Sequence, residues 1–238
     1  VTVENLHASN NNHGVQLCSS SYVTVRDCAI ANNSADGITI DYSSLNNTVI
    51  DDVIANNKFG IRVVHFSVNN TISRNNIIDS EKGMWIYAYC SDNMVTNNVI
   101  VGNSIGVSLE RESPCKIIGN TIAGNNQGLL LGTSGNLIYH NNFVNNTVQV
   151  EASKSSNIWD LGYSSGGNYW SDYEGEDANS DGIGDVSVVI DENDVDRYPL
   201  ASFWREEDEE PPAIGFPECF PRDDIQPYAE VTVYVAVT

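Results

Sequence analysis

Residues 177–185 place oxygen-bearing side chains at a spacing that could hold a metal ion. The oxygen donors fall at positions 1, 3, 5 and 9 of the segment, with Gly182 at position 6, as in an EF-hand calcium loop. Position 12 is Val188, which cannot supply the usual bidentate carboxylate. We therefore predict a Ca²⁺ loop that is completed from elsewhere, and the alternative is a solvated acidic turn. The predicted core ligands are Asp177, Asn179, Asp181 and Asp185, and the missing carboxylate would come from Asp191, Asp194 or Asp196.

Other residue types with catalytic potential form weaker patterns. Asp27, Asp51 and Arg74 share one repeat register, with Asp52 adjacent, and two carboxylates at this spacing could act as acid and base. A charge ladder in which Arg74 offsets Asp51 is the favoured alternative. The histidines do not share a column with one another; they are His7, His13, His65 and His140. We interpret His13 and His65, which flank predicted strands, as solvated surface residues.

A regular series of glycines shows that these residues lie on a repeat. Gly14, Gly37, Gly60, Gly83 and Gly106 are each 23 residues apart, and Gly128 follows after 22. An apolar-x-apolar triplet follows every one of them, and such triplets favour strands over helices. Three short strands with their turns use about one such period, which is the size of one coil of a parallel β-helix. The sequence thus predicts an all-β, right-handed parallel β-helix of about seven coils over residues 1–156.

Two asparagine columns have the same period as the glycines. Stacked asparagines can hydrogen-bond along a ladder and tolerate the backbone angles of turns. Because both columns keep step with the apolar period, they support the solenoid. One column holds Asn75, Asn98, Asn120 and Asn141, and the other holds Asn33, Asn57, Asn103, Asn125 and Asn146.

Residues 157–200 are predicted to cap the column. Five aromatic residues come shortly after the last coil, and large apolar groups suit the task of covering the open end of a β-helix. A sugar-binding platform is the alternative, and it would require some of these rings to be exposed. The aromatic residues are Trp159, Tyr163, Tyr169, Trp170 and Tyr173.

The sequence resembles a known family at these features. The 22–23-residue repeats look like those of β-helical carbohydrate-binding proteins and sugar hydrolases, and GGNYWSDYEGEDANSDGIGD followed by VIDENDVDRYPL resembles the terminal signature of NosD-like proteins found among archaeal cell-surface proteins. The resemblance covers roughly residues 1–200 and implies an extracellular or cell-surface setting. The NosD name also suggests periplasmic metal delivery, but no Met/His/Cys cluster supports a soft-metal site.

Charge, cysteines and glycosylation motifs add further expectations. The net charge is −21, with 21 acids and 4 bases in residues 151–238, which disfavours nucleic acid and anionic membranes as partners. No apolar run reaches the length of a membrane span. Two disulfides, Cys90–Cys115 and Cys18–Cys28, are predicted as alternatives to free buried thiols, with Cys219 left over. N-x-[ST] motifs that could accept N-glycans in an exported protein begin at Asn32, Asn46, Asn69 and Asn145, and the alternative is that an Asn-rich sequence produces such triplets by chance.

The tail, residues 201–238, is predicted to be an acidic, proline-rich linker followed by one strand. Apolar residues alternate in AEVTVYVAVT, which has no sequence neighbour to pair with. The strand could fold back onto the column, begin a further domain in a longer parent protein, or pair with another subunit to make a homo-oligomer or filament. The chain begins directly in an apparent strand, which indicates a processed or trimmed piece.

Two function classes follow from the sequence. The favoured one is an extracellular structural or binding protein, with a polysaccharide as a candidate partner. The alternative is a Ca²⁺-assisted polysaccharide lyase, hydrolase or epimerase on the same fold. An enzyme should show acids and bases clustered beside exposed aromatic residues along one sheet, whereas a structural protein should show ladders all round.

Overall fold

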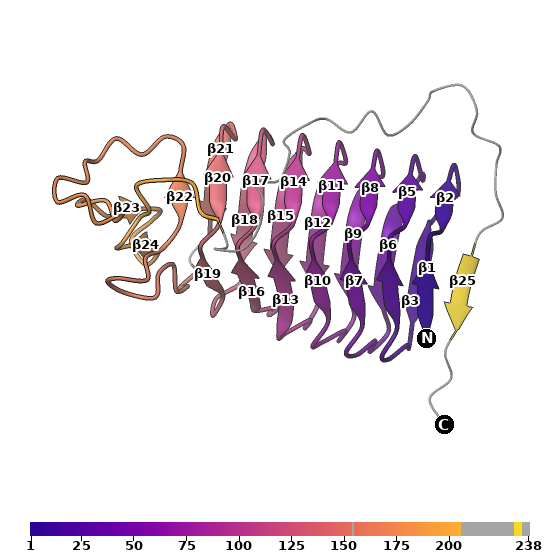
Figure 1. Cartoon of the computed structure of the whole chain (residues 1–238). Helices are drawn as coiled ribbons and strands as arrows, with labels where there is room; N and C mark the ends of the chain where they lie inside the picture. Colours follow the sequence, from indigo (N-terminus) through magenta and orange to yellow (C-terminus); the bar gives the residue numbers. More distant parts are fainter. Residues whose placement is uncertain (154, 206–230, 235–238) are drawn as a thin grey trace, which may run out of the picture.

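The computed structural model describes residues 1–153, 155–205 and 231–234, and over these residues the fold is all-β. Seven coils stack into a column with a cap at one end (Figure 1). This confirms the predicted parallel β-helix of about seven coils. Among the described residues, no helix is long and apolar enough to cross a membrane.

Each coil contributes one strand to each of three parallel sheets. Sheet A consists of β1 (Thr2–Glu4), β4 (Thr24–Arg26), β7 (Thr48–Ile50), β10 (Thr71–Ser73), β13 (Asn93–Thr96), β16 (Cys115–Ile118) and β19 (Leu137–Tyr139). Sheet B consists of β2 (His7–Ser9), β5 (Ala29–Ala31), β8 (Val53–Ala55), β11 (Asn76–Ile78), β14 (Val99–Val101), β17 (Thr121–Ala123), β20 (Asn142–Val144) and β22 (Tyr169–Trp170).

Sheet C has the longest strands. It consists of β3 (Val15–Cys18), β6 (Asp36–Asp41), β9 (Phe59–Val64), β12 (Lys82–Tyr87), β15 (Ile105–Glu110), β18 (Gln127–Gly132), β21 (Val148–Ala152) and β25 (Val231–Tyr234). In the cap, β23 (Val188–Val189) and β24 (Val195–Asp196) form a small antiparallel pair.

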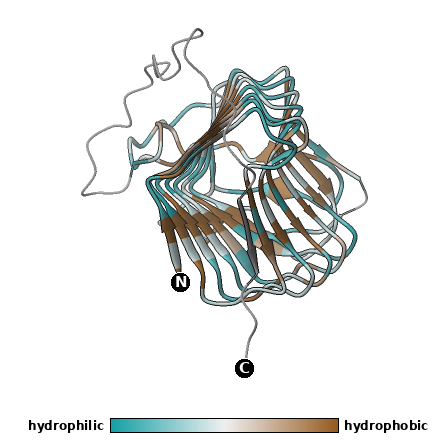
Figure 2. Ribbon diagram, turned by 90° about the vertical axis from the view of Figure 1, so that its right-hand side faces the viewer, coloured by the Kyte–Doolittle hydropathy of each residue, from teal (hydrophilic) through white to brown (hydrophobic). Residues whose placement is uncertain are grey.

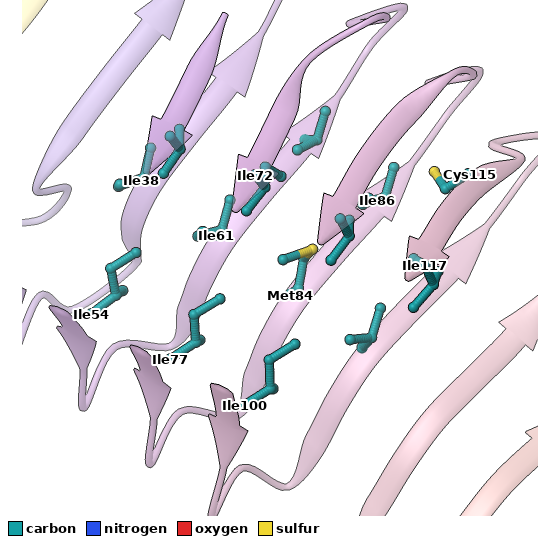
Figure 3. Packing of buried hydrophobic residues seen from close by; sticks show 14 of the residues in the cluster. Ile38, Ile54, Ile61, Ile72, Ile77, Met84, Ile86, Ile100, Cys115 and Ile117 are labelled. Atoms are coloured by element: carbon teal, nitrogen blue, oxygen red, sulfur yellow. The ribbon is translucent and has the colours of Figure 1, made fainter. Parts of the chain in front are cut away.

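The repeated apolar residues fill the inside of the column. Ile38, Ile61 and Met84 lie above one another in sheet C, and all are fully buried (Figure 3). Seen from its end, the column is hydrophobic within and polar at its outer turns (Figure 2). Because one coil has no second layer to pack against, this apolar interior exists only when coils stack.

Close packing between successive coils, at the start of the sheet C strands, requires the glycine column. A Cβ atom built on Gly60 would lie 2.5 Å from the carbonyl oxygen of Gly83 and 2.7 Å from Cγ2 of Ile77. Gly37 has the same surroundings one coil earlier. The 23-residue spacing of the glycines therefore reports the stacking of successive coils.

Both predicted asparagine columns form buried ladders. In the first, the backbone N–H and the side-chain amide of Asn75 each donate to Oδ1 of Asn98, at 3.0 Å. The second column repeats this geometry between Asn103 and Asn125. A third ladder, which the sequence analysis missed, links Asn47, Asn70 and Asn93 and resumes at Asn136 and Asn157. The asparagine pattern of this ladder is interrupted in the sequence because Cys115 occupies one of its positions.

The cap closes the column with tryptophans. Trp159 is fully buried, and Trp170 stacks on Phe143 of the last coil with ring centroids 4.5 Å apart. The two indole N–H groups donate to Asp194 and Asp196 respectively, both at 2.9 Å. The buried tryptophans thus act as a plug rather than as a sugar platform, whereas Tyr163 is 66% exposed.

The described cysteines are not paired. Cys18, Cys28, Cys90 and Cys115 are all free thiols, so the structure contains neither of the two expected disulfides. The Sγ atoms of Cys28, Cys90 and Cys115 each donate to a nearby backbone carbonyl instead. Burial raises the pKa of the Cys28 and Cys90 thiols to about 11, which keeps them protonated and unreactive. Cys219 lies outside the described residues.

The predicted terminal strand folds back onto the column. Val231–Tyr234 pairs in parallel with β3 at the edge of sheet C farthest from the cap (Figure 1). This is the first of the three arrangements expected for it. Most of the predicted acidic linker lies outside the described residues.

Candidate functional site

The outer face of sheet C carries a concentration of charged and aromatic side chains. Since alternate residues of a strand point to opposite sides, the residues between the buried apolar positions of β6, β9, β12 and β15 face outward. One outward column runs through Thr39, Arg62, Trp85 and Ser108. We call this surface the sheet C face.

A polar group that we call the Asp36 cluster occupies the part of this face nearest the first coil. Asp36 is 1% exposed, and its Oδ2 lies 3.0 Å from Nδ1 of His13, 2.8 Å from Nη2 of Arg62 and 2.6 Å from the hydroxyl of Thr39. Its Oδ1 is buried without a hydrogen-bond partner in the described part of the chain. A carboxylate that holds Nδ1 of an imidazole leaves Nε2 turned outward, which is the arrangement of an oriented acid–base histidine.

An aromatic strip follows on the next coils. The ring of Trp85 lies between Phe59 and Tyr87, with centroid distances of 5.1 and 5.0 Å. All three side chains are half-buried, so each ring keeps an accessible surface. Cations border the strip: Lys82 Nζ lies 4.7 Å from the Trp85 ring, and Arg111 lies 5.1 Å from Tyr87.

Glu110 fixes the middle of the strip. Its Oε1 accepts hydrogen bonds from Nζ of Lys82 at 2.9 Å, from the indole of Trp85 at 3.1 Å and from the hydroxyl of Ser108 at 2.7 Å. Burial alone would raise the pKa of Glu110, but the bonds from Ser108 and Lys82 lower it below its usual value. The carboxylate therefore stays ionised and holds the indole in one orientation.

The acid–base pattern predicted on another column is a charge ladder. Arg74 binds Asp51 through two parallel contacts of 2.8 and 2.7 Å, which confirms the interpretation that Arg74 offsets Asp51. Asp27 pairs with Arg26 instead. Asp52 is buried in line with the first asparagine ladder, where its N–H donates to Oδ1 of Asn75.

The solvated-surface interpretation is wrong for His13, whose side chain is 16% exposed, whereas the His65 side chain is 52% exposed and lies at the surface as expected. His13 contacts Asp36, and Nδ1 of His65 lies 2.7 Å from Oδ1 of Asp41. Neither contact can be found by comparing the positions of the four histidines with one another, because each partner is an aspartate. The usable signal was that His13 and Asp36 each directly precede a glycine of the repeat, which places them on adjacent coils.

The predicted core ligands in residues 177–185 bond to backbone N–H groups of the same segment, and its carboxylates do not form a group of three that could hold a metal ion. The N–H of Asp181 donates to Oδ1 of both Asp177 and Asn179 at 3.1 Å, and the N–H of Ala178 donates to Oδ2 of Asp185 at 2.9 Å. Hydrogen bonding from the N–H of Ile183 lowers the pKa of the exposed Asp181 carboxyl, which favours its charged form.

The three supplementary carboxylates have other partners. Asp194 accepts from the Asn157 backbone at 2.7 Å, and Asp196 accepts from the Asn168 backbone at 2.8 Å, so each ends an asparagine ladder. Asp191 accepts from the N–H of Asn193 and of Asp194. Asp194 and Asp196 are fully buried among these donors, which corrects their expected role as ligands.

The described residues do not assemble a soft-metal site. In residues 1–153 and 155–205, no three His, Cys, Asp or Glu side chains gather in a group that could hold a metal ion. Copper prefers imidazole, thiolate and thioether ligands, and three of the described cysteines are buried as thiols. The side chains present here therefore do not fit a copper centre.

The predicted glycosylation sites lie in turns. Asn46, Asn69 and Asn145 are exposed, and Asn32 is half-buried. All four have positive φ values, between 50° and 58°. Their attachment of glycans stays a prediction.

Comparisons with known proteins agree with this architecture. The model of the family described as periplasmic copper-binding protein (NosD) matches residues 1–175. A probable ABC transporter binding protein NosD from Stutzerimonas stutzeri is 41% identical over 70 residues, which are 29% of this chain and 15% of that protein. A solved structure of a double mutant of the periplasmic alginate epimerase AlgG matches with a TM-score of 0.53 and 17% identity, over 76% of this chain and 41% of that chain.

These matches differ in what they show. The likeness to the epimerase shows the fold alone, because the identity is low. The chain spans less than half the length of either protein. The periplasmic setting of the family agrees with the predicted location outside the cytoplasm. Because the family match covers most of the chain, including every coil, the chain belongs to the NosD family.

Proposed function

We propose that this protein binds a polysaccharide outside the cytoplasm, along the sheet C face. The observation that carries the proposal is the aromatic strip of Phe59, Trp85 and Tyr87 with its bordering cations. Sugar rings present apolar C–H faces to aromatic rings and hydroxyl groups to charged side chains. Glu110 fixes the indole of Trp85, so little rotamer freedom is lost on binding.

The test is binding of defined polysaccharides to the whole chain by affinity electrophoresis and calorimetry. An acidic probe, alginate, and a neutral probe, laminarin, separate the contribution of the cations from that of the rings. We expect Trp85→Ala to weaken binding about tenfold or more, as for a central aromatic contact. Tyr22→Ala is the matched control, because Tyr22 is 73% exposed and lies outside this face. Unchanged binding by Trp85→Ala would refute the proposal.

A second candidate function is sugar chemistry on the same face. The Asp36 cluster favours it, because an oriented imidazole and a guanidinium lie beside the aromatic strip, which is the arrangement expected of an enzyme. His13 would act as the acid–base group, with Asp36 as its positioning residue.

Incubation with the polysaccharide that binds, with and without Ca²⁺, tests this candidate by the appearance of new chain ends or altered sugar configuration. His13→Asn should abolish turnover and leave binding intact, and Asp36→Asn should lower turnover and change its pH profile. If the unaltered protein binds the polysaccharide without turning it over, the enzymatic candidate is refuted and only the binding function stands.

We further propose that residues 177–185 bind Ca²⁺. The side-chain oxygens of Asp177 and Asn179 both accept from the N–H of Asp181, and this supports the proposal because it brings two of the four predicted ligands together. The ion would neutralise the repulsion among the carboxylates of the loop.

A further inference from the structure

The cap continues two of the three sheets and leaves the third with a free edge. In sheet A, Leu137 forms a bridge with Ile158 of the cap, and in sheet B, β20 pairs with β22. Sheet C ends at β21, and no strand within the described ranges follows it on the cap side. The column therefore lacks one rung at this corner.

The free edge presents backbone hydrogen-bonding groups. The N–H of Ser153 donates to the carbonyl of Leu131 in β18, at 3.0 Å. Because successive residues of a strand direct their N–H and C=O groups to opposite sides, those of Ala152 and Val150 point away from β18. Peptide groups at such an edge are suited to accept another strand.

A groove lies beside this edge. It has a volume of about 690 Å³ and is walled by residues 147–150, at the start of β21, on one side and by residues 172–175 and 186–190 of the cap on the other. Its apolar side chains are unusually accessible: Val148 is 44% exposed, Val186 58% and Val189 69%. An extended apolar segment would cover them.

The chain itself contains a segment with the required form. Val231–Tyr234 already pairs in parallel with β3, with Val231 opposite Val15 and Val233 opposite Leu17. Followed from coil to coil, these two positions of sheet C become Val150 and Ala152 in β21. Residues 231–238 carry no charged side chain and alternate apolar residues, which suits pairing with the free edge of β21.

We propose that the free edge of β21, next to the groove, accepts Val231–Tyr234 from a second copy of the chain as the next rung of sheet C. The added strand would be parallel, with Val231 opposite Val150 and Val233 opposite Ala152. Since the groove lies at the cap end and β3 at the opposite end (Figure 1), this exchange joins molecules head to tail. The proposal is independent of polysaccharide binding.

Sedimentation velocity of the whole chain over a concentration series tests the proposal. The unaltered protein should associate, and Ala152→Pro should weaken association about tenfold or more, because proline removes an N–H that only the incoming strand uses. Ala152→Ser is the matched control and should associate normally. Val189→Asp, on the opposite wall, should also weaken association, whereas Leu161→Asp should not, since Leu161 is an exposed cap residue outside the groove.

Deleting residues 229–238 identifies the occupant. Loss of association on deletion, together with restored binding of a synthetic peptide of residues 229–238 to the groove of the shortened chain, would support the proposal. A chain that stays monomeric at every concentration would overturn it. So would assembly that persists in both Ala152→Pro and Val189→Asp, or that survives the deletion.

Discussion

At the scale of single residues, Asp52 is a carboxylate in a place built for asparagine. Its Oδ1 accepts from the N–H of Cys28 at 2.8 Å, and its own N–H donates to Asn75. Its Oδ2 is buried without a hydrogen-bond partner in the described part of the chain. Burial raises the pKa of Asp52 to about 6. An asparagine there could donate to a neighbouring carbonyl, as Asn75 does to that of Val49 at 3.0 Å.

We predict that Asp52→Asn stabilises the protein at neutral pH. The pKa of Asp52 is higher in the folded than in the unfolded state, so the cost of its ionisation to folding builds up between about pH 4 and pH 6 and reaches about 3 kcal/mol above that window. The unaltered protein should gain stability as pH falls from 7 towards 4, and the advantage of the variant should shrink over that window.

Urea denaturation at pH values across this window measures the difference between the two proteins. Comparing them removes the parallel contribution of Asp196, whose pKa burial also raises to about 6. Asp79→Asn, at an exposed carboxylate away from Asp52, is the control and should change little. A variant less stable than the unaltered protein at pH 7 would contradict the prediction.

At the scale of elements, residue spacing in the sequence predicts the features that every coil repeats. It does not predict surfaces that are assembled from different residue types on successive coils. The glycine, apolar and asparagine columns were visible because every coil supplies the same residue type. The sheet C face was not predicted, because each coil contributes a different residue type to it. Thr39, Arg62 and Trp85 show no repeated pattern in the sequence and become neighbours only when the strands pair. The partners of Asp194 and Asp196 were not predicted, because the two residues bond to Asn157 and Asn168. These lie 37 and 28 residues earlier in the chain, outside the spacing of the repeat.

We predict that Gly60→Ala destabilises the column by about 3 kcal/mol or more, as for overpacking in a rigid core. The new Cβ would contact the backbone carbonyl of Gly83, which cannot move without disturbing the next coil. Gly132→Ala is the matched control, because its nearest neighbour would be at 3.6 Å, an ordinary contact. Denaturant unfolding compares the two variants, and equal losses would contradict the packing argument.

At the scale of the whole molecule, cap and column are connected by many contacts. The ladders end on Asp194 and Asp196, and residues 177–185 are joined to the same region by the bond from Gly184 N–H to the carbonyl of Pro199 at 2.8 Å. A ligand of the loop should therefore stabilise the column as well as the cap.

We predict that Ca²⁺ raises the melting temperature of the entire chain relative to a chelator. Binding at a hundredfold excess over Kd would add about 2.7 kcal/mol. Asp181→Asn should remove most of this increase, whereas Glu192→Gln, which changes the same charge outside the loop, should retain it. Calorimetry gives the comparison, and identical melting with and without Ca²⁺ would leave the loop as a solvated turn.

The ladders have a further consequence for the column. Along the asparagine rungs, the backbone N–H and one side-chain N–H donate toward the cap, and Oδ1 accepts from the coil before it, as between Asn75 and Asn98. The other side-chain N–H bonds a backbone carbonyl of the preceding coil. The amide dipoles therefore add along the axis, with a positive pole at the cap, much as peptide dipoles add in a helix. Asp194 and Asp196 sit at that pole, so the solenoid has an electrostatic polarity that its anionic end residues complement.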